Sequence, residues 1–92
     1  MHKRYHFIFS GTVQGVGFRY TARALAEKYS LTGWAANLVD GRVELEIEGD
    51  EADIKKFLDD LRTGFKSYIS GVGKEEIASL SKETGFYIKF LR

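Results

Sequence analysis

The order in which two hydrophobic spacings follow each other along the chain constrains its fold most. Strand-like segments, in which apolar and β-branched residues dominate or alternate with polar ones, cover residues 5–10, 31–38 and 42–49, more weakly 75–81, and again 85–91. Between them, apolar residues recur at i, i+3, i+4 and i+7 in two stretches. These stretches predict one helix from Phe18 or Arg19 to Tyr29, and a second that Asp50 caps and Gly64 ends. The predicted order is strand, helix, strand, strand, helix, strand, with one short extra strand at the end.

An Asp40-Gly41 pair between the second and third predicted strands indicates an antiparallel hairpin, because these residue types favour tight turns. Each half of the chain then forms a strand-helix-strand crossover, and the hairpin joins the halves. This arrangement is the ferredoxin-like split βαββαβ sandwich, an α+β fold. We expect an antiparallel sheet with two helices on one face and a short extra C-terminal strand. The fold serves many activities, so it does not name one.

Acidic residues occupy alternate positions of the third predicted strand. Glu44, Glu46 and Glu48 alternate with apolar residues, so we expect an exposed sheet face there rather than a metal or acid–base site. Residues 65–73 follow neither spacing, and we expect an irregular segment. Its aromatic residues Phe65 and Tyr68 are expected to be exposed and to mark a contact surface.

The composition excludes several classes of function. A chain of 92 residues with 43% hydrophobic side chains suits one domain spanning residues 1–92. Lys and Arg number 14 against 13 Asp and Glu, and a net charge of +1 gives no general field that attracts nucleic acids or acidic membranes. There is no cysteine and there are two histidines, so we expect no metal site and no cofactor. No apolar run approaches the length of about 18 residues that crosses a bilayer. We expect a cytoplasmic monomer.

The glycine-rich segment 11–17 lies between a predicted strand and a predicted helix, where free backbone N–H groups and the positive end of the helix dipole converge. Gly15 and Gly17 allow positive φ angles, which bring successive N–H groups toward one anion. Arg19 adds a guanidinium that can bind two oxygens at once. The sequence lacks the Gly-Lys-Ser/Thr of nucleotide-triphosphate loops, and Tyr20 stands where a dinucleotide fingerprint starting at Gly15 needs its third glycine. An ordinary tight turn with a surface arginine is the alternative.

The residues themselves carry a resemblance to a known family. The segment Gly11 to Tyr20, followed by Gly33-Trp34-Ala35-Ala36-Asn37, by Asp40-Gly41 and by the terminal segment 85–89, resembles the acylphosphatase family over most of the chain. The resemblance implies hydrolysis of the carboxyl-phosphate bond of a small-molecule acylphosphate, without a metal, to a carboxylate and inorganic phosphate. It also implies that Arg19 binds the phosphate and that Asn37 positions the water.

The resulting site hypothesis combines the loop with these two side chains. The catalytic residues would be Arg19 and Asn37, and the phosphate would be bound by Gln14, Gly15, Val16, Gly17, Phe18 and Arg19. An asparagine amide can orient water but cannot take up its proton. Tyr20 and Trp34 are expected to pack, and Arg23 to be solvated or to add positive potential. The alternatives are a ferredoxin-like module that binds RNA, or one that binds phosphate without turnover.

Overall fold

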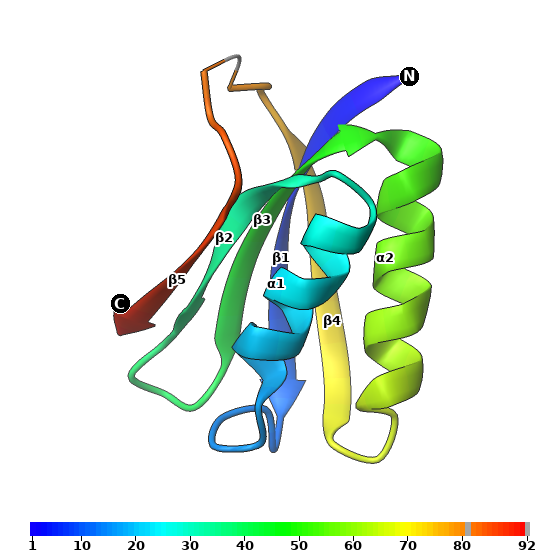
Figure 1. Ribbon diagram of the computed structural model, residues 1–92. Helices are drawn as coiled ribbons and strands as arrows, with labels where there is room; N and C mark the ends of the chain where they lie inside the picture. Colours follow the sequence, from blue (N-terminus) through cyan, green and yellow to red (C-terminus); the bar gives the residue numbers. More distant parts are fainter. Residues whose placement is uncertain (81, 92) are drawn as a thin grey trace.

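The computed structural model describes residues 1–80 and 82–91, which form five strands and two helices (Figure 1). In chain order these are β1 (His2–Gly11), α1 (Phe18–Lys28), β2 (Thr32–Asn37), β3 (Val43–Asp50), α2 (Glu51–Gly64), β4 (Ile69–Ile77) and β5 (Phe86–Leu91). The predicted order is confirmed. Among the described residues, no helix has both the length and the apolar character needed to cross a membrane.

The five strands form one sheet in the order β4-β1-β3-β2-β5, and both helices cover the same face of it (Figure 1). The predicted ferredoxin-like α+β fold is confirmed. The sheet is mixed, however: β1 pairs antiparallel with β3 and β4, β2 pairs antiparallel with β3, and β5 pairs parallel with β2. Because β4 and β5 lie at opposite edges, the connection between them crosses one end of the sheet. As a result β5 runs parallel to β2, whereas the predicted sheet was antiparallel.

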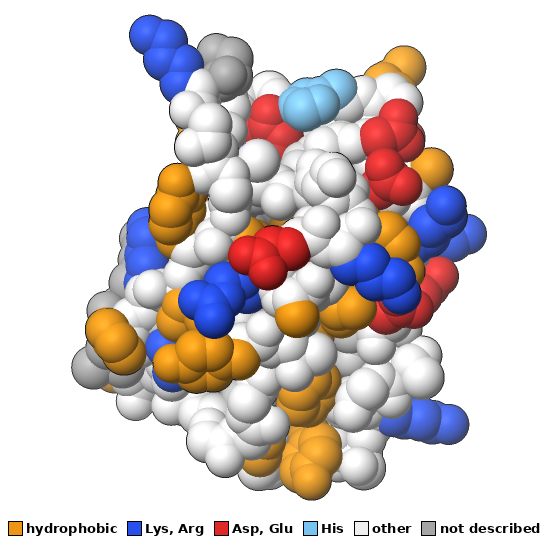
Figure 2. Space-filling view, viewed as in Figure 1, with side chains coloured by type: hydrophobic (Ala, Val, Ile, Leu, Met, Phe, Trp, Pro, Cys, Tyr) orange, Lys and Arg blue, Asp and Glu red, His pale blue; other side chains and the backbone are white. Residues whose placement is uncertain are grey.

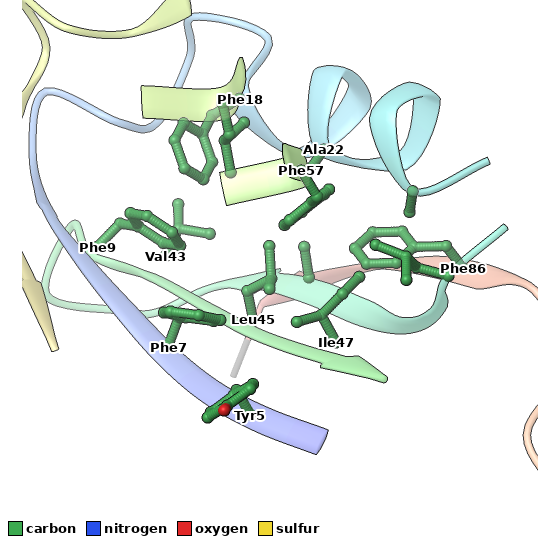
Figure 3. Close-up of a cluster of buried hydrophobic side chains, with 14 of the residues drawn as sticks. Tyr5, Phe7, Phe9, Phe18, Ala22, Val43, Leu45, Ile47, Phe57 and Phe86 are labelled. Carbon is green, nitrogen blue, oxygen red and sulfur yellow. The ribbon is translucent and has the colours of Figure 1, made fainter. Parts of the chain in front are cut away.

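The core lies between the sheet and the two helices. Alternate residues of β1 and β3 point toward the helices, and Phe7, Phe9, Leu45 and Ile47 are fully buried there (Figure 3). The helices supply the opposing side chains, among them Phe57. Burying a side chain of this size contributes roughly 1.5–3 kcal/mol, so these contacts hold both helices on the sheet.

Phe18, the first residue of α1, anchors the start of that helix in the core. It is 1% exposed, and its ring lies 4.9 Å from that of Phe9 and 5.0 Å from that of Phe65, centroid to centroid. Tilted aromatic pairs at such distances are favourable beyond the area they bury. The glycine-rich loop before Phe18 is therefore fixed at both ends, by β1 and by this ring.

The segment predicted to be irregular, 65–73, contains the start of β4 at Ile69. A turn precedes the strand, with the Tyr68 N–H donating to the Phe65 oxygen at 2.9 Å. Both aromatic residues of this segment were predicted to be exposed. The prediction is wrong for Phe65, which is only 7% exposed, and it is confirmed for Tyr68. Gly71 and Gly73 interrupt the alternation that would have revealed the strand. The predicted end of this strand at residue 81 is also wrong, since the strand stops at Ile77.

The glutamates of β3 do not form an exposed face, contrary to the prediction. Antiparallel pairing puts Arg4 opposite Glu48 and His6 opposite Glu46. The Arg4 guanidinium is buried and donates to Glu46, Glu48 and Glu83. His6 shares a hydrogen bond of 2.7 Å with Glu44.

The β3 glutamates lie on the second face of the sheet, the one that points away from the helices. The connection between β4 and β5 covers part of this face. Ser79 Oγ and the Leu80 N–H donate to the Glu48 carboxylate at 2.6 and 2.8 Å. Burial alone would raise the pKa of Glu48, but donors from Ser79, His2, Leu80 and Arg4 outweigh it and hold the pKa at about 2. The connection is therefore held on the sheet by buried charge.

Candidate active site

A small pocket of about 150 Å³ opens beside the first turn of α1. Its walls come from the loop after β1, from the start of α1 and from the end of β2. The residues that line it are Val13, Gly15, Gly17, Phe18, Arg19, Tyr20 and Asn37. The structure thus brings Arg19 and Asn37, 18 positions apart in the sequence, to one cavity together with the loop. A larger groove of about 580 Å³ lies between α2 and Tyr5, away from all of these residues.

The loop presents backbone N–H groups with no partner. Gly15 and Gly17 adopt φ angles of 74° and 81°, which only glycine reaches without strain. The first helical hydrogen bond of α1 runs from the Thr21 N–H to the Gly17 oxygen, so the preceding N–H groups have no acceptor within the helix. Within the described part of the chain, no N–H from Gly15 to Tyr20 donates to another protein group.

The positive end of α1 is also left without a compensating acid. No side chain caps this helix and its first turn contains no acidic residue. In α2 the reverse holds: Asp50 accepts from the Ala52 N–H at 2.9 Å, and Glu51 and Asp53 lie in the first turn. Since anions are favoured at a helix N-terminus, the start of α1 is suited to bind one from outside the chain.

Arg19 is half-buried and extends from α1 toward β5. Its Nη1 donates to the Lys89 oxygen at 2.7 Å, and its guanidinium carbon lies 6.0 Å from the centre of the Phe90 ring. The guanidinium has five N–H donors, so holding one of them leaves others for a ligand. The role of β5 in fixing this side chain was not predicted, because the two partners lie 70 residues apart in the sequence.

Asn37 ends β2 on the side of the sheet that faces the helices. The register between β2 and β5 shifts between Ala36 and Asn37, at the wall of the pocket. The Asn37 Oδ1 atom is buried and has no hydrogen-bond partner among the described residues. A buried acceptor without a donor is costly, and it is satisfied when a small molecule such as water donates to it.

Two predicted phosphate ligands do not line the pocket with their side chains. Gln14 donates through Nε2 to the oxygens of Leu38 and Arg42, at 2.7 and 3.0 Å, and so ties the loop to the hairpin between β2 and β3. Val16 packs against the core. Any contact of these two residues with an anion would be through their main-chain N–H groups.

Tyr20 was expected to pack, but it is 54% exposed and lines the pocket. The guanidinium carbon of Arg23 lies 5.4 Å from the centre of its ring. Trp34 does pack: it is buried on the second sheet face beneath Lys89. Among residues 1–80 and 82–91 there is no group of three or more His, Cys, Asp and Glu arranged to hold a metal ion.

Comparisons with known proteins agree with one another. The acylphosphatase family model matches residues 5–88. An acylphosphatase of Bacillus velezensis is 41% identical over 88 residues, which cover 95% of this chain and 98% of that protein. The crystal structure of acylphosphatase from Bacillus subtilis has a TM-score of 0.86 at 37% identity, covering 97% of this chain and 99% of that one. The structure of an acylphosphatase from Coxiella burnetii has a TM-score of 0.85 at 36% identity, covering 96% of this chain and 93% of that one. With the loop, the arginine and the asparagine gathered in one pocket and likeness extending over nearly the whole length, the chain belongs to the acylphosphatase family.

Proposed function

We propose that the pocket binds the phosphoryl group of an acylphosphate and that Asn37 holds the water that attacks it. Members of this family are hydrolases that act on acid anhydrides, and here the products would be a carboxylate and inorganic phosphate. The observation that carries the proposal is that Asn37, whose buried Oδ1 has no partner among the described residues, lines the same pocket as the free N–H groups and Arg19.

The phosphoryl group would be held by charge alone. It carries about two negative charges near neutral pH, and the N–H groups from Gly15 to Tyr20, the start of α1 and the free donors of Arg19 all favour negative charge. In the transition state the phosphoryl group loosens and its charge spreads over the outer oxygens. Donors that are already fixed stabilise this charge without reorganising, which is commonly the largest contribution to such catalysis.

Water would be oriented, not deprotonated, by Asn37. The Oδ1 atom accepts a hydrogen bond from the water, whose oxygen forms the new bond to phosphorus while the bond to the acyl oxygen breaks. The bonding electrons leave with the carboxylate, which is a stable anion and needs no acid to protonate it. The proton of the water passes to a phosphate oxygen or to solvent, because an amide cannot accept it. We propose that this reaction needs no metal.

RNA binding is the less favoured alternative because of the charges on the sheet. An RNA-recognition sheet stacks bases on an open face, whereas here that face carries the β3 glutamates and the connection that covers Glu48. On the helical face, basic side chains are interspersed with acidic ones and do not gather in one patch (Figure 2). We propose that the partner is a small-molecule acylphosphate.

The deciding experiment is steady-state hydrolysis of benzoyl phosphate, with and without inorganic phosphate as competitor. Arg19→Ala is expected to lower kcat/KM by about 10³ and to abolish competition by phosphate, since the guanidinium contacts both bound and reacting groups. Arg62→Ala, an exposed arginine in the last turn of α2, is the matched control and should behave as wild type. Equal phosphate inhibition of the Arg19 variant and wild type would contradict the assignment. Phosphate binding by wild type without turnover would show a binding module instead.

A further inference from the structure

The pocket is small compared with sites that enclose a drug-sized ligand. Its volume of about 150 Å³ is half or less of the roughly 300–1,000 Å³ typical of sites that enclose a small organic ligand. If the proposed function is correct, the phosphoryl group lies against the loop inside the pocket, and an acyl group as large as benzoyl extends through its mouth. The side chains at the mouth therefore decide which acyl groups are accepted.

One side of the mouth is formed by Tyr20, and Arg23 lies against Tyr20. The Tyr20 ring lines the pocket and is exposed, and the Arg23 guanidinium lies over this ring. Arg23 follows Arg19 by four residues, so it lies on the same face of α1, about 6 Å further along the helix axis. It is exposed and forms no ion pair with any described residue, including Glu27 one turn beyond it.

Arg19 and Arg23 follow each other along this face of α1, and neither forms an ion pair with a described residue. Like charges four residues apart on a helix repel each other, and Arg19 lies in the first turn, where the helix dipole also disfavours positive charge. The first turn of α1 contributes no acid to offset them. A phosphoryl group near Arg19 would neutralise the charge of the first arginine. A second anionic group about one helical turn away would neutralise the charge of Arg23.

We propose that Tyr20 and Arg23 form a subsite for the acyl group that selects acylphosphates with a second anionic group, a carboxylate or a phosphate, on the acyl part. The Tyr20 ring contacts the carbon skeleton, and the Arg23 guanidinium binds the second anion. Because this anion lies away from the reacting phosphorus, it is bound alike in the ground state and in the transition state. Arg23 therefore acts on KM and leaves kcat nearly unaffected for such substrates.

The test compares rigid aromatic acylphosphates that differ only in the second group. Benzoyl phosphate carries none, 3-carboxybenzoyl and 4-carboxybenzoyl phosphate carry a carboxylate at two distances, and 4-phosphonobenzoyl phosphate carries a phosphate-like group. The readout is the ratio of kcat/KM for each anionic substrate to that for benzoyl phosphate, measured in the same enzyme preparation. In wild type at low salt we expect at least one of these ratios to be about five, the upper range for an exposed ion pair.

Arg23→Gln should bring that ratio to about one through KM, and Arg23→Glu should bring it below one, since a repelling charge replaces an attracting one. The matched control Arg62→Gln should keep the wild-type ratio. Salt at about 0.5 M should shrink the ratio in wild type, because an exposed ion pair is screened. A ratio that does not change in Arg23→Gln would overturn the subsite, while benzoyl phosphate turnover by the same preparations would leave the proposed function standing. Absence of turnover on every substrate would instead overturn the proposed function.

Discussion

Replacing Arg4 with methionine is expected to destabilise the fold by about 3–5 kcal/mol at neutral pH, because it breaks a buried ion cluster from one side. The guanidinium contacts Glu46, Glu48 and Glu83 at 2.7 to 3.1 Å. Glu46 and Glu83 lie near enough to the surface to regain water. Glu48 is 3% exposed and would stay buried with the donors of His2, Ser79 and Leu80 as its partners among the described residues. Methionine keeps most of the apolar stem of arginine, so the loss of stability measures the effect of removing the charge and not of removing packing contacts.

Thermal unfolding followed by circular dichroism measures this loss. For a domain of this size 1 kcal/mol moves Tm by about 4–8 °C, so a decrease of at least about 12 °C is expected. Lys3→Met is the matched control on the same strand: its ion pair with Glu76 is 3.3 Å long and exposed, and such pairs contribute less than about 1 kcal/mol. If Arg4→Met unfolds at nearly the same temperature as Lys3→Met, the buried cluster does not stabilise the fold and the reasoning is refuted.

Acid should narrow the difference between wild type and the Arg4 variant. The pKa of Glu48 lies at about 2 in the folded protein against an ordinary 4.5. A carboxyl whose folded pKa is lowered stabilises the fold above the unfolded value and loses this contribution as the pH falls through the folded one, here about 3 kcal/mol in all. Without Arg4 the pKa of Glu48 should rise in part, because Ser79, His2 and Leu80 still lower it, so the variant has less to lose. Urea unfolding between about pH 5 and 3 should show the gap closing, and a constant gap would contradict this.

Three further predictions concern the pocket. Asn37→Ala should lower kcat by about 10² to 10³ with little change in KM, and should not lower Tm because it removes an unsatisfied buried acceptor; a rise in KM at constant kcat would assign Asn37 to substrate binding. Gly17→Ala should weaken inhibition by phosphate about tenfold, since a side chain at a φ of 81° strains the loop by about 1–2 kcal/mol, whereas Gly64→Ala, at an ordinary helical φ, should leave phosphate inhibition as in wild type; equal inhibition of both variants would count against the loop. EDTA should not change the rate, and loss of turnover that a divalent cation restores would show a metal requirement.

The elements whose causes are local were predictable from the sequence. Helical spacing located α1 and α2, and Asp50 caps α2 as expected, accepting from an N–H two residues away. The Asp40-Gly41 turn forms as predicted, with Gly41 at a φ of 96°. Each of these depends on interactions between residues close in the chain, whose residue types carry the signal directly.

Contacts across strands were not predictable in the same way. Alternation in β3 correctly indicated one buried face, but it could not tell whether the other face was solvated or covered. Only the fold brings the connection after β4 over Glu48 and sets Arg4 opposite it. Similarly, Gly71 and Gly73 hide the spacing of β4, whose identity as a strand depends on its pairing with β1.

The same division applies to the site. The sequence by itself determined a loop able to reach positive φ angles before a helix, and an arginine one residue into that helix, because both properties belong to the residues concerned. Only the tertiary structure decided that the Lys89 oxygen fixes Arg19, that Gln14 holds the loop to a hairpin and that Asn37, with an unpartnered oxygen, lines the same pocket. The hydrogen bonds of Gln14 and Arg19 join residues 24 and 70 positions apart. Burial of the core brings such distant segments together, and no short stretch of sequence indicates which of them will meet.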